Sequence, residues 1–174
     1  PQGWFLPVTP GTQLVTLGGA LANDVHGKNH HRDGSFGRHV LGFELIRSDG
    51  SRRWCSPEEN TDWFAATIGG MGLTGIISRI ALQLKRVPSP DVRQETIRLD
   101  RLADFFALAA ESDANFDYVV AWLDSLARGA KLGRGLLLRG NHAGPDRPAV
   151  KRGWSLPFPL DPPAPLINGL TICV

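Results

Sequence analysis

The chain has 174 residues, of which 42% are hydrophobic and 21% charged, and this composition is ordinary for a globular protein and not for a disordered one. Its net charge is +2 and its basic residues are scattered, which argues against a dedicated nucleic-acid binder. Two distant cysteines, Cys55 and Cys173, exclude a disulfide scaffold and favour a reducing compartment. No apolar run approaches the ~20 residues that span a bilayer.

A short apolar stretch over residues 14–20 contains Gly18 and Gly19 and leads into a polar segment over 23–38. Paired glycines let a backbone approach a ligand closely and offer N–H groups to an anion such as a pyrophosphate; a tight turn is the alternative. The 23–38 segment is rich in glycine and histidine and has no helix or strand period. A long irregular loop between apolar segments is typical of a functional loop.

The histidines of this loop, His26, His30 and His31, could be read as a metal cluster. No cysteine or carboxylate stands at zinc-site spacing beside them, so we favour hydrogen-bonding roles and predict that His26 contacts substrate or cofactor. Lys28 adds a positive charge to the same loop. We expect turn and cap roles, not paired acid–base roles, for two loop carboxylates, Asp24 and Asp33.

A hairpin is predicted where Asp49 and Gly50 separate two strand-like runs, 40–47 and 51–55, because both turn residues tolerate positive φ. A helix is predicted to follow, with Ser56 as its cap. Its other signals are a proline at the first position, a capping-box glutamate, an apolar side and a glycine end: Pro57, Glu59, Trp63, Phe64, Ile68, Gly69 and Gly70.

Four glycines lie within residues 69–75, which is more than a single turn requires. Either this segment is a flexible connector or its backbone lies against a flat or phosphorylated ligand. Nearby apolar residues, which usually pack, favour the ligand: Leu73, Ile76 and Ile77.

Alternation over 76–87 predicts a half-buried strand with Ile80, Leu82 and Leu84 on one face. Pro88–Pro90 breaks it and marks a domain junction. Further on, the pattern predicts a helix capped by Asp100, a strand over 116–123 and a proline-rich surface excursion over 143–165. The apolar residues at helical spacing are Leu102, Phe105, Phe106 and Ala109.

Several of these segments together resemble the decaprenylphosphoryl-β-D-ribose 2-oxidase family, within the vanillyl-alcohol-oxidase type (PCMH-type) FAD-binding superfamily. The resemblance covers roughly residues 3–140. The segments that carry it are Val15–Ala20, Asp24–His31, Gly34–Gly37, Ala66–Gly70, Gly72–Ile77, Ala121–Asp124 and Lys131–Arg134. The chain departs from the family at Met71, where a polar residue is usual, and in the proline-rich stretch.

The resemblance implies an α+β fold, with the C-terminal part of a PCMH-type FAD-binding domain over 1–88 and the beginning of an antiparallel-sheet substrate domain over 89–174. It also implies non-covalent FAD and oxidation of the 2-hydroxyl of a polyprenylphosphoryl ribose for arabinan and cell wall synthesis. The family's active-site lysine and first phosphate-binding loop have no match here. We therefore expect the fragment alone to be inactive. The opening on Pro1–Phe5 and the closing apolar run Leu170–Val174 lead us to expect that both chain ends are cuts.

By motif, residues of the glycine-rich segments would contact FAD: Gly18, Gly19, Asn23, Asp24, Gly27, Gly70, Leu73, Thr74 and Ile76. His26, Lys28 and Trp122 would face the substrate, with His26 and Lys28 assisting catalysis, and the resemblance implies no metal.

The partners implied are a lipid-linked sugar phosphate or another polyol and an epimerising reductase, and no nucleic acid. The expected location is the cytoplasm, with peripheral membrane association for a polyprenyl substrate. Another FAD-linked sugar or alditol oxidase, a non-catalytic FAD-fold scaffold and a metal-binding histidine-loop protein remain as alternatives.

Overall fold

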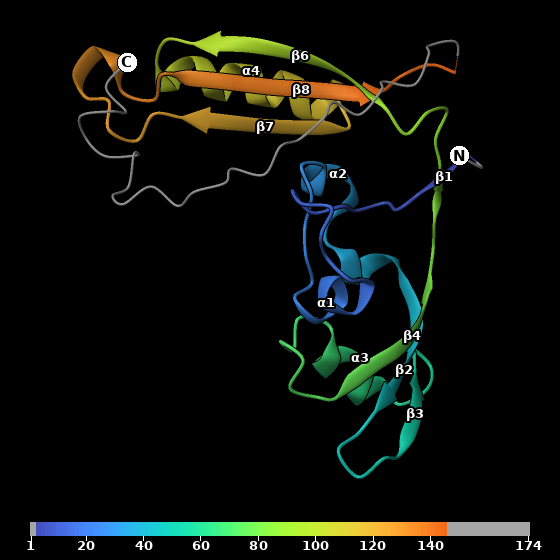
Figure 1. Ribbon diagram of the computed structural model, residues 1–174. Coiled ribbons are helices and arrows are strands. Elements are labelled where there is room, and N and C mark those ends of the chain that lie inside the picture. Colours follow the sequence, from blue (N-terminus) through green and yellow to red (C-terminus); the bar gives the residue numbers. More distant parts are fainter. Residues whose placement is uncertain (1–2, 146–174) are drawn as a thin grey trace, which may run out of the picture.

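The computed structural model describes residues 3–145, which form two parts, each with its own three-stranded antiparallel sheet (Figure 1). The first part contains β1 (Trp4–Phe5), α1 (Leu17–Ala22), α2 (His30–Asp33), η1 (Phe36–His39), β2 (Val40–Ile46), β3 (Arg52–Cys55), α3 (Thr61–Thr67), β4 (Ile76–Leu82) and β5 (Lys85–Arg86). The second contains β6 (Val92–Leu99), α4 (Leu102–Asn115), β7 (Tyr118–Leu123), η2 (Gly129–Lys131) and β8 (Gly135–His142).

The first sheet has β2 at its centre, in the order β3-β2-β4, and the short strands β1 and β5 pair separately. The predicted hairpin is confirmed between β2 and β3. Gly50 adopts φ +80°, and the Asp49 carboxylate accepts a hydrogen bond from the backbone N–H of Ser51 at 2.8 Å. Asp49 and Gly50 therefore form the hairpin turn that this pair of residues predicts.

A buried apolar cluster beneath this sheet holds the first part together. Phe43 and Leu45 of β2 and Leu21 of α1 have no exposed surface, and the rings of Phe43 and Phe64 stack with centroids 5.5 Å apart. The residues predicted for the apolar side of α3, Trp63, Phe64 and Ile68, all pack against this cluster.

The predicted start of α3 is wrong by several residues. The hydroxyl of Ser56 does accept two backbone N–H groups, those of Glu58 and Glu59, both at 3.1 Å. These bonds close a separate turn, and the helix begins at Thr61 after Asn60, whose backbone is left-handed at φ 51°. The capping-type bonds therefore form, but they precede the helix instead of starting it.

The second sheet has the order β6-β8-β7, and α4 lies along one of its faces (Figure 1). Because side chains alternate across a strand, the register divides β8 into residues that face α4, such as Leu137 and Arg139, and residues on the opposite, open face. Arg139 forms ion pairs with Glu95 of β6 at 2.9 Å and Glu111 of α4 at 3.1 Å. This arginine thus ties the helix to the sheet.

Two details of the second part differ from prediction. Arg101, and not Asp100, is the residue that precedes α4, and Asp100 instead pairs with Arg98 at 3.1 Å. Phe106, expected on the packed side of this helix, is 63% exposed. The predicted strand over 116–123 is confirmed as β7.

The predicted strand over 76–87 is interrupted. β4 ends at Leu82, so Leu84 falls outside it and is exposed, and β5 then pairs with β1. The chain passes from the first sheet to the second after β5, at Pro88–Pro90.

Helices and antiparallel sheets agree with the α+β class, while the half-domain description and the two-domain division stay predictions. The proline-rich stretch and Cys173 lie largely or wholly outside the described residues, and no helix within 3–145 is long and apolar enough to cross a membrane.

Candidate functional site

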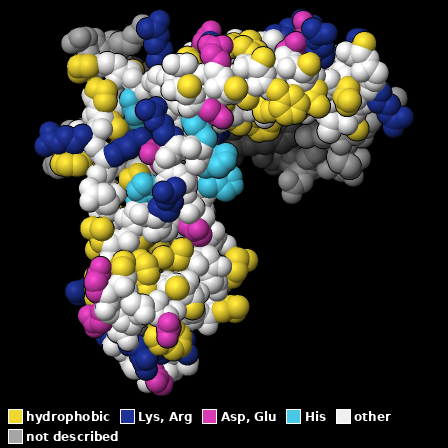
Figure 2. All heavy atoms as spheres, turned by 180° about the vertical axis from the view of Figure 1, so that it is seen from behind, with side chains coloured by type: hydrophobic (Ala, Val, Ile, Leu, Met, Phe, Trp, Pro, Cys, Tyr) yellow, Lys and Arg dark blue, Asp and Glu magenta, His cyan; other side chains and the backbone are white. Residues whose placement is uncertain are grey.

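The histidine loop lies where the first part meets the open sheet of the second, and Figure 2 shows histidine side chains gathered there. The predicted absence of regular structure in 23–38 is wrong: the segment contains α2 and η1, and residues His26 and Ser35 form an isolated bridge. The irregular composition hides these short elements, because each is too brief to show a period.

Three contacts attach this loop to β7 and its approach. The carbonyl of Lys28 accepts the backbone N–H of Val119 at 2.8 Å. Nε2 of His31 bonds the carbonyl of Phe116 at 3.1 Å, and Arg32 pairs with Asp117 at 2.7 Å. Because β7 is an edge strand, its free edge is the place where a loop can be joined by backbone hydrogen bonding.

The interior of the loop is packed too tightly for side chains at Gly27. A Cβ there would lie 2.6 Å from Oδ1 of Asn29 and 2.7 Å from the carbonyl oxygen of Thr9. Asn29 is fully buried and donates through Nδ2 to the carbonyl of Pro7 at 2.7 Å and to the carboxylate of Asp33. Gly27 is therefore required by the close approach of the 7–9 segment, whatever ligand it also faces.

The two loop carboxylates bind groups of the protein itself, although the Asp33 side chain forms neither a turn nor a cap bond. Oδ1 of Asp24 accepts the backbone N–H of Gly37 at 2.7 Å, and the backbone of Asp24 is left-handed at φ 41°. Asp33 accepts from Lys85 at 3.1 Å in addition to Asn29. Neither carboxylate is paired with the other for acid–base chemistry.

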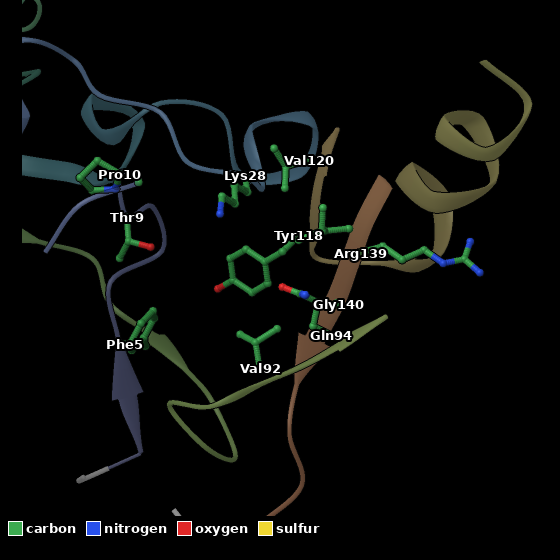
Figure 3. A pocket seen from close by; sticks show the side chains of 12 residues that line it. Phe5, Thr9, Pro10, Lys28, Val92, Gln94, Tyr118, Val120, Arg139 and Gly140 are labelled. Atoms are coloured by element: carbon green, nitrogen blue, oxygen red, sulfur yellow. The ribbon is translucent and has the colours of Figure 1, made fainter. Parts of the chain in front are cut away.

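A cavity of about 260 Å³ lies between the histidine loop, the segment 9–11 and the open face of the second sheet (Figure 3). Lys28 lines it, and within residues 3–145 its ammonium forms no ion pair. Tyr118 and Val120 of β7 and Gln94 of β6 contribute from the sheet. The structure thus brings Lys28 opposite strand residues that the sequence motifs did not single out.

Trp122 shares the open face with these strand residues. It lies two and four positions beyond Val120 and Tyr118 on β7, and 66% of its surface is exposed. His26, also exposed, lies in the same loop as Lys28, with its ring 5.7 Å from that of His30 in an edge-to-face arrangement. Of the three predicted substrate-facing residues, Lys28 lines the cavity, whereas neither His26 nor Trp122 belongs to its lining.

Burial raises the pKa of Tyr118 to about 12, and the nearby carboxylates of Asp117 and Asp33 act in the same direction. The phenol is therefore neutral at physiological pH and contributes hydrogen bonds, not charge, to the cavity. Sequence reasoning missed this residue, although the period-2 alternation that places residues 118, 120 and 122 on one face could have found it.

Gly18 and Gly19 lie within helix α1, and neither forms the tight turn considered as an alternative. The side chain of Thr16 caps this helix by accepting the N–H of Gly19 at 3.0 Å. Since that N–H is satisfied, Gly19 does not offer it to a pyrophosphate. Asn23 closes the other end of α1, where Nδ2 donates to the carbonyl of Gly19 at 2.8 Å.

The second glycine segment is attached to the end of α1. The N–H groups of Gly69 and Met71 donate to the carbonyls of Leu21 at 3.1 Å and Ala22 at 2.8 Å. A Cβ at Gly70 would lie 2.1 Å from the carbonyl oxygen of Ala66, so this glycine is required by the end of α3. These bonds make the segment an anchored loop and not a flexible connector.

Beyond this anchor, Leu73, Thr74 and Ile76 line a second cavity of about 350 Å³ together with Arg47. The guanidinium of Arg47 donates to the carbonyl of Thr74 and lies 4.3 Å from the ring centre of Trp63. Leu73 is 88% exposed. The buried hydroxyl of Thr74 has no hydrogen-bond partner within the described part of the chain.

These features fit FAD, a long cofactor with a flat apolar ring system and a polar phosphate and ribose region. In the second glycine segment the exposed Leu73 offers an apolar contact and the unpartnered Thr74 hydroxyl offers a polar one, which are the two kinds of contact that FAD requires. A metal site finds no such support: over residues 3–145 no three histidine, cysteine or acidic side chains gather closely enough to hold an ion.

Comparison with known proteins also points to FAD. A family model described as an FAD binding domain matches residues 1–56. The chain is 41% identical over 145 residues to decaprenylphosphoryl-beta-D-ribose oxidase of Mycolicibacterium smegmatis, covering 82% of the chain and 32% of that protein. It is 42% identical over 179 residues to an uncharacterized protein in the mprA 5′ region of Streptomyces coelicolor, covering 98% of the chain and 48% of that protein.

A more distant relative, Delta(24)-sterol reductase of Rattus norvegicus, is 33% identical over 87 residues, which is 50% of the chain and 16% of that protein. The chain thus spans less than half the length of these curated relatives. Taken with the site geometry, the domain match and these similarities show that the chain carries an FAD-binding domain of this family, and its cofactor is FAD.

Proposed function

We propose that this protein oxidises a sugar hydroxyl, the 2-hydroxyl of a polyprenylphosphoryl ribose, with hydride transfer to FAD. The observation that carries the proposal is the cavity in which Lys28, without an ion pair in the described structure, faces the open sheet that also bears Trp122. The similarity to the ribose oxidase over 82% of the chain supports the same substrate class.

FAD supplies the acceptor for the hydride that leaves the sugar carbon. The residues of this chain would bind and orient the sugar. The Lys28 ammonium can only donate hydrogen bonds, so it would hold a sugar or phosphate oxygen at one wall of the cavity. The exposed Trp122 ring would cover an apolar sugar face.

Alcohol oxidation also requires that the hydroxyl proton leave. Within this chain the imidazole of His26 is the group that could accept it, because the side chain is exposed on the same loop as Lys28. Nδ1 of His26 lies 3.4 Å from the carbonyl oxygen of Gly27, and this contact leaves Nε2 available. We therefore assign His26 a proton-accepting role and Lys28 an orienting role.

The substrate class has two consequences for the setting of the protein. A polyprenyl chain resides in a membrane, so we propose that the protein works in the cytoplasm against a membrane surface. Oxidation gives a ketone at the sugar carbon, and a reductase that returns the hydroxyl with the opposite configuration would consume it.

The test is a visible absorption spectrum of the purified full-length flavoprotein before and after anaerobic addition of a polyprenylphosphoryl ribose analogue. We expect loss of the oxidised flavin bands within the time of turnover. A Lys28→Met variant should retain bound flavin and be reduced at least tenfold more slowly at low substrate concentration.

Bleaching by alditols but not by the ribosyl analogue would reject the lipid-linked sugar and favour an alditol oxidase. A flavin spectrum that no polyol alters would favour a scaffold role. A protein that purifies without flavin would contradict the proposal altogether.

A further inference from the structure

Tyr118 and His142 form a hydrogen-bonded pair on the open face of the second sheet. The Tyr118 oxygen lies 2.9 Å from Nε2 of His142, and Nδ1 of the same ring lies 2.8 Å from the carbonyl oxygen of Ser89. A carbonyl only accepts, so Nδ1 carries the hydrogen of the neutral ring. Nε2 is then the acceptor, and the Tyr118 hydroxyl donates its single hydrogen to it.

The pair is held from several elements. The His142 ring contacts Phe5 of β1 and Tyr118 of β7 edge-on, both with centroids 5.4 Å apart. The ammonium of Lys85 lies 5.6 Å from the centre of the Tyr118 ring. These contacts restrict both rings, so the phenol hydrogen has one direction in which to point.

The phenol oxygen also borders the cavity that Lys28 lines, and Figure 3 shows the Tyr118 ring projecting into the space bounded by Lys28, Thr9 and Phe5. In the sheet register Tyr118 lies opposite Gly140, which in turn lies opposite Gln94 on β6. The glycine between them carries no side chain. The cavity therefore has its floor at Gly140, with the phenol oxygen at its side.

We propose that Tyr118 determines the specificity of this cavity by presenting a hydrogen-bond acceptor, and that His142 is the positioning residue that holds it in that role. A tyrosine hydroxyl ordinarily donates or accepts, but here its hydrogen is committed to His142. The ligand at this wall must donate, whereas at the Lys28 wall it must accept. A polyol with a hydroxyl toward Tyr118 and an oxygen or phosphate toward Lys28 satisfies both, and in this respect the inference rests on the proposed function.

The experiment uses the purified flavoprotein and polyprenylphosphoryl ribose analogues in which each free hydroxyl is replaced in turn by fluorine, which keeps similar size but cannot donate. Affinity is measured from the change in the flavin spectrum on binding. We expect one analogue to bind wild-type protein about five- to tenfold more weakly than the parent, as for one neutral hydrogen bond.

Tyr118→Phe keeps the ring contacts and removes the oxygen. It should bind the parent about five- to tenfold more weakly and no longer distinguish it from that one analogue. His142→Phe removes the acceptor, frees the Tyr118 hydrogen to donate and should also abolish the distinction. His142→Gln, whose amide oxygen can accept from Tyr118, should restore it.

A Tyr118→Phe protein that keeps the wild-type preference, or that loses affinity equally for every analogue, would overturn the inference and leave Tyr118 a packing residue. Failure of the proposed function looks different: wild-type flavin would be reduced by none of the ribosyl compounds. Alditols with the same fluorine replacements then serve as probes, and a wild-type flavin that neither panel perturbs would overturn both proposals.

Discussion

The backbone N–H of Val119 donates to the carbonyl of Lys28 at 2.8 Å, which joins the edge strand of the second sheet to the histidine loop of the first part. Lys28 is therefore held by its main chain on one side while its side chain lines the cavity. The relative position of loop and sheet sets the width of this cavity. Contacts that shift the loop should accordingly change ligand binding without touching a ligand.

Tyr118 should titrate late. It is the only tyrosine of the chain, and burial raises its pKa to about 12 from an ordinary value near 10. In a spectroscopic titration, we expect tyrosinate absorbance to appear at a pH about two units higher in folded protein than in denatured protein. Tyr118→Phe should show no such absorbance in either state.

The same shift makes stability depend on alkaline pH. The unfolded chain releases this proton near pH 10, and the folded chain keeps it to about 12. The contribution of Tyr118 to stability is therefore complete below pH 10 and declines as pH rises through 12. An equal decline in Tyr118→Phe would contradict this assignment.

Gly27→Ala should move the histidine loop. The new methyl group would lie 2.6 Å from Oδ1 of Asn29 and 2.7 Å from the carbonyl of Thr9, so one of them must shift. We expect a loss of about 1–3 kcal/mol in the free energy of unfolding, measured by urea denaturation, and weaker substrate binding. Gly144→Ala is the matched control, because a Cβ there meets nothing within 4 Å, and it should stay within about 0.5 kcal/mol of wild type.

Asp24→Ala should separate the structural role of this carboxylate from cofactor contact. It removes the acceptor for the N–H of Gly37 and places alanine at φ 41°. A loss of about 2–3 kcal/mol in unfolding free energy is expected. Asp24→Asn keeps an acceptor and tolerates this backbone, so its loss should be under about 1 kcal/mol. Equal destabilisation by both would mean that the negative charge itself is needed.

Trp122→Ala should impair binding more than stability. The side chain is 66% exposed, so its removal should change the unfolding free energy by less than about 0.5 kcal/mol. Loss of a ring that covers the substrate should raise KM at least severalfold, measured by steady-state oxidation of the ribosyl analogue. Leu132→Ala, at a residue 54% exposed outside the open face, is the control and should leave KM unchanged.

Much of the fold follows from local signals. Asp49 and Gly50 do form the hairpin turn, alternation does locate β4, and the strand predicted over 116–123 is β7. Helix starts were predicted less well, because Ser56 makes capping-type bonds that close a turn, with Asn60 inserted before α3. Local sequence specifies which bonds a serine can make, whereas tertiary packing decides where the helix begins.

In the candidate site, too, local motifs identify some residues, whereas the contacts between them depend on tertiary packing. The motifs pointed to His26, Lys28 and Trp122, and the structure places these in one loop and one sheet face; their roles stay predictions. Gly18 and Gly19 are predicted to bring their backbone against an anionic ligand or to form a tight turn, but the Thr16 cap and packing on β4 place them in helix α1. The cavity pairing of Lys28 with Tyr118 depends on contacts 90 positions apart in the chain, which no local pattern contains.

The alternation of β8 carries a consequence for evolution by insertion and deletion. One face of this strand supplies Leu137 and Arg139 to the helix-covered interior, and the other supplies Gly140 to the floor of the cavity. A single residue gained or lost just before Leu137 would move both residues by one position, so that Arg139 would face the cavity and Gly140 the helix-covered interior. We therefore expect a length change within β8 to be tolerated only when a second change restores the register. Substitutions on the two faces, in contrast, can occur independently.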